Sequence, residues 1–286
     1  MNKFICIAFG FCVYSHDSVM KRIISVIVGI VAFASSARAQ FTDSASGLLQ
    51  MPTAEIEEEG TFMITNNYLN KHSLSPSGWG YDTFAYGFNI AFWNRLEVGY
   101  VCTIFDGKRK PNPTDRDKIM FNQDRHFTGK IKILNEGEFG LKWVPAFAVG
   151  ISDPTTGSSG GGYADLNVEG SGNGYFNRVY AALSKNFGTR WGRVGVHLAY
   201  IYNRRTDYPI NGPAVGVCWR PVWLESLPVL DWVNIIAEYD ARTVNAGFIA
   251  SVWDNRFELM FEMQNMRWIN FGARFKLRLA GHDTVE

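Results

Sequence analysis

Residues 268–279 read WINFGARFKLRL and alternate almost without error between apolar and polar side chains. One face carries Ile269, Phe271, Ala273, Phe275, Leu277 and Leu279, and the other carries Asn270, Gly272, Arg274, Lys276 and Arg278. Successive side chains of a strand point to opposite faces. A strand of about 9–11 residues with one apolar and one polar face is typical of a membrane β-barrel. A soluble sandwich can also hide such a strand, so other features of the chain must decide.

A secretory signal peptide is one such feature. Met20-Lys21-Arg22 precedes an uncharged run from Ile23 to Phe33, and Ala37-Arg38-Ala39 forms a cleavage site. The apolar run is too short for a transmembrane helix. We expect residues 1–39 to be a leader with the signal over 20–39 and Gln40 to be the first mature residue. Met20 is an alternative translation start, because the signal begins there.

The cysteines offer an alternative leader and little else. A lipoprotein signal ending at Cys12 would need small residues before it, where Phe9 and Phe11 are bulky. Cys102 and Cys218 are far apart in the sequence and form neither a disulfide framework nor a metal-binding pattern. We expect no metal and no cofactor. The formal net charge of +1 gives no electrostatic support for nucleic-acid binding.

Alternation and turn residues predict about twelve strands. Their expected ranges are 60–70, 81–93, 95–105, 123–135, 138–152, 173–187, 192–204, 211–220, 232–241, 243–253, 255–265 and 267–279. The fold class is therefore all-β, an antiparallel up-and-down transmembrane barrel. We assign residues 40–59 to a periplasmic entry segment, 60–280 to an outer-membrane β-barrel and 281–286 to a tail.

The connections alternate between long and short. Residues 71–80, 106–122, 153–172 and 205–210 are rich in Gly, Ser, Pro, Asp and Lys, whereas turns such as Asn94 and Asp254 are tight. Outer-membrane barrels have long outer loops and short periplasmic turns. The insert 221–231 is a longer connection on the predicted periplasmic side.

Tryptophans cluster beside the short turns. The ring of tryptophan favours the boundary between membrane and water, where its N–H stays hydrated. The predicted periplasmic girdle consists of Trp93, Trp191, Trp219, Trp232 and Trp253.

The polar strand faces predict a lumen of mixed charge. A basic residue on the lipid face would cost about 2–4 kcal/mol at the bilayer midplane, so the charged faces are expected to point inward. The candidate lumen residues are Glu97, Lys130, Lys132, Lys142, Arg178, His197, Glu238, Glu258, Glu262, Arg274, Lys276 and Arg278. Twelve strands lie between a barrel filled by side chains and an open pore, so the lumen is either plugged or a narrow channel.

The segment before the first strand reads GLLQMPTAEIEEEGT over residues 47–61. Pro52 can begin a short helix, Glu55, Glu57 and Glu58 would lie at its positive end, and Gly60 can end it. We therefore expect a short periplasmic helix here.

This segment, with a signal before it and a barrel pattern after it, resembles the start of the YjbH-like family of outer-membrane proteins. The resemblance rests on Gly47, Pro52, Ala54 and Gly60 and on the Gly60-Thr61 strand entry. It implies a β-barrel linked to exopolysaccharide or capsule production and export, in contact with outer-membrane lipid, polysaccharide and other export proteins. It implies no catalytic residue. The larger family members contain more than one barrel-sized region, and this chain is much shorter.

Two other functions remain open. A small porin or lipid-binding channel would share the same strand pattern. An outer-membrane hydrolase would need a nucleophile beside a histidine. The candidates are His126 or His197, or His126 with Asp115, Asp117 and Asp124, and a solvated polar loop is the favoured interpretation of these aspartates. We favour a non-catalytic outer-membrane barrel that assists polysaccharide export or surface assembly.

Overall fold

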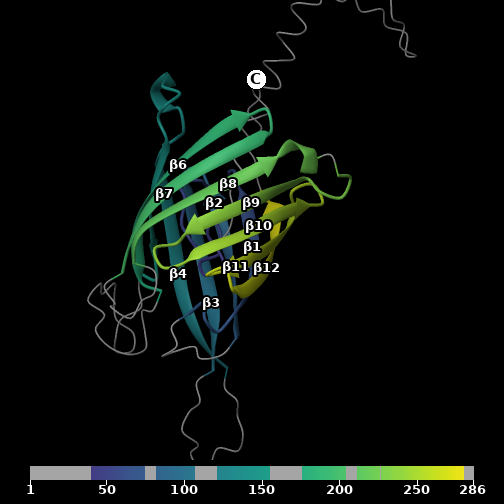
Figure 1. The fold of residues 1–286 in the computed structure, drawn as a ribbon. Helices are drawn as coiled ribbons and strands as arrows, with labels where there is room; N and C mark the ends of the chain where they lie inside the picture. Colours follow the sequence, from purple (N-terminus) through teal and green to yellow (C-terminus); the bar gives the residue numbers. More distant parts are fainter. Residues whose placement is uncertain are drawn as a thin grey trace, which may run out of the picture. The chain divides into compact units, whose positions relative to one another are not determined.

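Twelve antiparallel strands close into a barrel in the computed structural model (Figure 1). Each strand pairs with its neighbours in sequence, and β12 pairs with β1 to complete the ring. The strands are β1 (Thr61–Leu69), β2 (Thr83–Phe92), β3 (Leu96–Asp106), β4 (Phe121–Leu134), β5 (Ala146–Ser152), β6 (Arg178–Thr189), β7 (Gly192–Tyr202), β8 (Gly212–Pro221), β9 (Trp232–Tyr239), β10 (Val244–Val252), β11 (Phe257–Gln264) and β12 (Trp268–Arg278). The predicted all-β class, the antiparallel up-and-down barrel and the strand number are confirmed.

The structure describes residues 40–74, 82–106, 121–154, 176–203, 211–225 and 227–279. They all belong to the compact unit formed by residues 36–286, and the other unit, residues 1–35, lies outside them. The predicted signal peptide, the Cys12 alternative, Asp115, Asp117, the tail and most of the long connections also fall outside the described residues. No helix in the described part is long and apolar enough to cross a bilayer.

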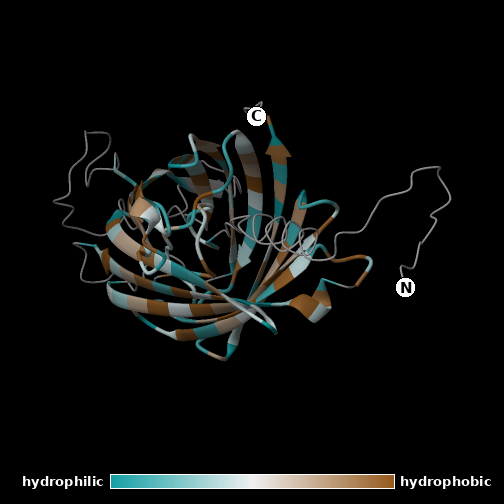
Figure 2. Cartoon of the chain, turned by 90° about the horizontal axis from the view of Figure 1, so that it is seen from above, coloured by the Kyte–Doolittle hydropathy of each residue, from teal (hydrophilic) through white to brown (hydrophobic). Residues whose placement is uncertain are grey.

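The two faces of the wall differ in polarity, as the alternation predicts. Odd positions of β1 and β7 and even positions of β6 and β12 point inward and are mostly buried. Large apolar side chains on the outer face are exposed, including Ile64 (47%), Leu198 (50%) and Phe271 (52%). The bands of hydrophobic and hydrophilic residues along the strands are visible from above in Figure 2. The outer surface of the ring is therefore broadly apolar.

Short turns and both ends of the wall share one end of the barrel, called here the short-turn end. The turns that follow β2, β6 and β10 are tight, and the backbone N–H of Leu279 donates to the carbonyl of Gly60 at 2.9 Å. The predicted insert after β8 is present and contains a 3-10 turn, η2 (Val222–Leu224), with an exposed Trp223.

The fifth strand is shorter than predicted. Residues 138–145 were expected to be extended, but Glu138–Gly140 form a 3-10 turn, η1, and β5 begins only at Ala146. Positive φ angles at Gly137 (74°) and Gly140 (72°) turn the chain back on itself. Lys142, predicted to face the lumen, therefore lies in the turn before β5 and is exposed.

The entry segment also differs from the prediction. No helix forms over residues 52–59, and Pro52 instead forms an isolated bridge with Gly47. Local signals at Pro52 and Gly60 favour a helix turn, but tertiary contacts of residues 40–57 outweigh them.

Candidate functional site: a lumen filled by residues 40–57

Residues 40–57, called here the plug, lie inside the ring of strands. Every residue in this range is buried, although none belongs to a strand or a helix. The plug contacts inward-facing side chains of β1, β3, β4, β5, β6, β9, β11 and β12. Contacts with so many strands place it across the lumen rather than at one mouth.

An apolar cluster forms one part of the contact. Phe41, Leu48, Leu49 and Met51 of the plug pack with inward residues of the wall such as Ile249. Full burial of one leucine contributes about 1.5–3 kcal/mol relative to exposure. The lumen is thus a mixed core, and the expectation that its wall is polar holds only in part.

Glu97 and Lys130 bind the middle of the plug backbone. They are directly opposite each other on β3 and β4, with Nζ of Lys130 3.3 Å from a carboxylate oxygen of Glu97. Glu97 accepts hydrogen bonds from the N–H of Ser46 at 3.1 Å and the N–H of Glu57 at 2.9 Å. Lys130 donates to the carbonyl of Ser46 at 2.7 Å. One wall pair thus satisfies donors and acceptors that would otherwise be buried unpaired.

Glu238 and Glu262 hold the plug on the opposite wall. The carboxylate of Glu238 accepts from the N–H groups of Leu49 at 3.0 Å and Gln50 at 2.7 Å. The side-chain amide of Gln50 donates to Glu262 at 2.7 Å, and Asn270 donates to the same carboxylate oxygen at the same distance. The Gln50 contacts fix both the backbone and the side chain of this residue.

Asp43 forms a buried ion pair with Arg178 near the start of β6. Its Oδ2 also accepts a hydrogen bond from Ser152 at 2.6 Å, and Nε2 of His126 lies 3.7 Å from Oδ1. Burial alone would raise the pKa of Asp43, but the charge of Arg178 and the contacts with His126 and Ser152 outweigh it and hold that pKa well below its usual range. Asp43 is therefore charged and paired inside the barrel.

A second ionic group lies where the plug joins the wall. Glu57 lies 2.7 Å from Nζ of Lys276 and 3.9 Å from Arg274, and both bases also bind Glu258. Burial raises the pKa of Glu57 in spite of these two positive neighbours. The last residue of the plug is thus anchored to β12, whose two bases also pair with Glu258 of β11.

Glycines in the wall make room for the plug. A Cβ atom at Gly216 would lie 2.3 Å from Cδ1 of Leu48 and 2.7 Å from Sδ of Met51. At Gly87 the same atom would lie 3.0 Å from Oγ of Ser44. A larger residue at Gly216 therefore requires the side chains of Leu48 and Met51 to move.

Residues 42–200 match the family model YjbH, described as exopolysaccharide biosynthesis protein YbjH. This chain belongs to the YjbH family. The match covers most of the plug and the wall from β1 into β7, so the predicted resemblance is confirmed. No curated protein matches the chain.

Most predicted lumen residues of this YjbH-family chain line the plug. Eight of them are almost fully buried: Glu97, Lys130, Arg178, His197, Glu238, Glu258, Glu262 and Arg274. Lys132 and Lys276 are partly buried. Arg278 is exposed at the end of β12, where it pairs with Glu58 at 3.2 Å. Lys142 is the exception noted above.

The family-motif positions lie in or beside the plug. Gly47 and Pro52 form the bridge that folds the segment back on itself. The N–H of Ala54 donates to Ser184 at 2.9 Å, and Gly60, with a φ of 75°, leads into β1. The sequence pattern identified these residues, but it predicted that they form a short helix at the periplasmic mouth of the barrel. The polar partners of the whole plug lie on eight strands and come together only in the closed ring.

The predicted tryptophan girdle divides into two groups. Trp93, Trp191 and Trp253 are exposed by 62–68% at the short-turn end, and Trp219 is half-buried on the outer face. The prediction was wrong for Trp232. Its side chain lies on the same inward face of β9 as Asn234 and is buried, and its indole N–H donates to Asn255. Sequence reasoning missed Trp143 and Trp223, which are exposed within the longer connections after β4 and β8.

The two candidate catalytic histidines are both covered by the plug. His197 Nδ1 lies 2.9 Å from Oγ of Ser184, the same hydroxyl that binds Ala54. His126 stacks on Phe176 and approaches Asp43. A substrate could reach either histidine only after the plug moved.

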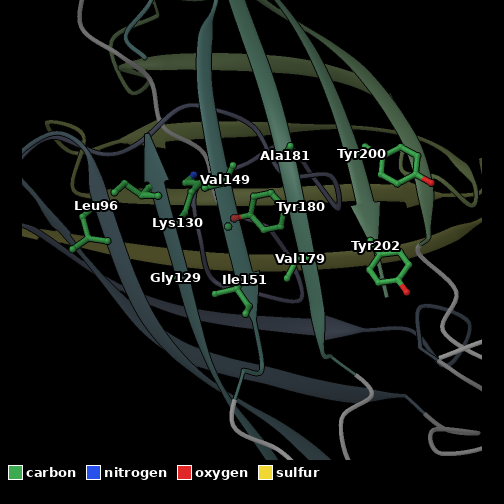
Figure 3. Close-up of a pocket in the computed structure, with 12 residues that line it drawn as sticks. Leu96, Gly129, Lys130, Val149, Ile151, Val179, Tyr180, Ala181, Tyr200 and Tyr202 are labelled. Atoms are coloured by element: carbon green, nitrogen blue, oxygen red, sulfur yellow. The ribbon is translucent and has the colours of Figure 1, made fainter. Parts of the chain in front are cut away.

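A hollow of about 720 Å³ lies on the outer wall over β4, β5 and β6. Gly129 and Gly150 are among the residues that line it. Val149, Ile151 and Val179 are among the apolar residues around it (Figure 3). Tyr180 points inward and its ring crosses beneath Gly150, where a Cβ would lie 2.2 Å from Cζ. The hollow thus belongs to the apolar outer surface and does not open the lumen.

Proposed function

We propose that this YjbH-family chain is an outer-membrane β-barrel that assists the export or surface assembly of an exopolysaccharide and catalyses no reaction itself. The observation that carries the proposal is a closed barrel with an apolar outer surface and a plugged lumen. A broad exposed apolar surface is unfavourable in water and favourable in a bilayer.

The membrane part of the proposal draws on three independent features. The predicted signal peptide directs the chain out of the cytoplasm. Outward apolar side chains surround the ring, and exposed tryptophans gather at its short-turn end, where the membrane boundary would lie. With outer-membrane topology the short-turn end faces the periplasm.

The polysaccharide part draws on the family, whose description names exopolysaccharide biosynthesis. A lumen occupied by the plug favours an accessory or assembly role over free diffusion of solutes. Charged side chains of the wall form hydrogen bonds with the plug backbone, as Glu97, Lys130 and Glu238 do. The porin alternative requires the plug to leave.

Two measurements on the producing bacterium test this function. The mature chain is expected in the outer-membrane fraction as a band whose gel mobility shifts on heating, because a closed barrel resists detergent until it is boiled. Deletion of the gene is expected to reduce surface polysaccharide, and a plasmid copy of the wild-type gene should restore it, whereas the empty plasmid should not. Unchanged polymer in the deletion strain would refute the polysaccharide role, and a soluble folded monomer would refute the membrane location.

A further inference from the structure

Gln40 is held at both ends inside the lumen. Its backbone N donates to the carbonyl of Ala45 at 2.8 Å, and its Oε1 accepts from Nη2 of Arg178 at 2.9 Å. A Cβ on Gly47 would lie 2.5 Å from Cγ of Gln40, so the aliphatic part is also closely packed. The residue is fully buried.

Cleavage after Ala39 would turn this backbone N into an α-amine. An α-amine has a pKa of about 7.7–8.0 and is largely charged at neutral pH, and burying an ammonium group is costly. At the other end, Nε2 of the Gln40 side chain is buried and has no hydrogen-bond partner. A buried donor without a partner costs free energy as well. The mature Gln40 would thus place two unfavourable groups in the lumen.

We propose that Gln40 is a modification site and that the mature chain begins with pyroglutamate. The α-amine nitrogen bonds to Cδ of the same residue, and the bond between Cδ and Nε2 breaks. Nε2 leaves as ammonia with the proton that the amine gives up, so no oxidant or further reactant is needed. The product is a neutral five-membered lactam.

The lactam matches the site better than the open residue. It keeps one N–H for the carbonyl of Ala45 and one carbonyl oxygen for Arg178, the two contacts that the structure contains. It removes the charge of the amine and the unpartnered Nε2 together. The inference goes beyond the proposed function, because it depends only on secretion and on cleavage after Ala39.

Mass spectrometry of the intact, denatured protein tests the proposal. The full precursor is expressed in a Gram-negative host and the product is purified from membranes. We expect a chain that begins at residue 40 and is lighter by one ammonia than the unmodified sequence, with an N-terminus that an amine-selective reagent does not label.

Gln40→Asn is the matched control. Asparagine keeps the carboxamide but could close only a four-membered ring, so this variant should retain a free, labelled N-terminal amine. If the variant fails to accumulate, the mass of the wild-type chain alone decides. A wild-type chain with unmodified Gln40, or one that begins at another residue, would overturn the proposal.

Discussion

Deletion of residues 42–55 is expected to convert an electrically silent barrel into one that carries a steady ionic current. The deletion removes the apolar cluster of Leu48, Leu49 and Met51 and the N–H groups of Ser46, Leu49 and Gln50 that bind Glu97 and Glu238. It retains Gln40 and Phe41 next to the predicted cleavage site. The twelve-strand wall would then surround water and charged side chains, and a ring of this size lies between a filled barrel and an open pore.

Planar-bilayer recording of purified wild-type and deleted protein measures the effect. The heat-dependent gel shift of each sample shows that the barrel is intact, so absence of current cannot be attributed to unfolding. Gly216→Leu is a milder version, because its side chain must displace Leu48 and Met51. Gly129→Leu is its matched control on the outer face, where the nearest atom to a new Cβ is 3.9 Å away. Steady current from the wild type, or silence from an intact deleted barrel, would contradict a lumen closed by the plug.

Lys130→Met is expected to lower the free energy of unfolding by about 3 kcal/mol, the lower end of the range for removing one partner of a buried ion pair. Lys130 is almost fully buried, and its loss leaves the Glu97 carboxylate without a positive neighbour at 3.3 Å. Hydrogen bonds from Ser46 and Glu57 still reach Glu97, which limits the loss. The double variant Lys130→Met with Glu97→Gln should recover part of it, because the uncompensated charge is removed.

Urea unfolding in lipid vesicles, followed by tryptophan fluorescence, measures these differences. Lys185→Met is the control: Lys185 pairs with Glu136 at 3.0 Å, but its side chain is 20% exposed. A pair in contact with water contributes about 0–1 kcal/mol. Equal losses for the two lysine variants would argue against a buried role for Lys130.

The strands of the barrel wall could be predicted from the sequence because the two faces of each strand lie in different environments. Alternation over 268–279 predicted β12 within a residue at each end, and the twelve predicted strands correspond to the twelve observed. The error at β5 arose because residues 138–145 keep some alternation, whereas Gly137 and Gly140 bend the chain. The prediction for Trp232 was wrong because a position near a turn does not show which face of the strand the side chain occupies, and Trp232 lies on the inward face of β9.

The position of the plug inside the barrel could not be predicted in the same way. Its contacts join residues far apart in sequence, such as Gln50 with Glu262, and they exist only once β12 has paired with β1. Local signals at Pro52 and Gly60 predicted a helix, and burial inside the ring overrides such signals. The charged strand faces predicted groups that point inward, but the sequence left open whether the lumen is plugged or a channel and did not show that the entry segment fills it.

Disulfide trapping between the plug and the wall tests the central claim most directly. The side-chain oxygens of Ser44 and Thr65 of β1 are hydrogen-bonded to each other, so Ser44→Cys with Thr65→Cys brings two sulfurs together in a background where Cys102 and Cys218 are replaced by alanine. Oxidation of intact membranes is predicted to link the two cysteines, with both thiols shielded from a water-soluble maleimide beforehand. Free labelling of the cysteine at position 44 without any link would contradict a barrel filled by its own N-terminal segment.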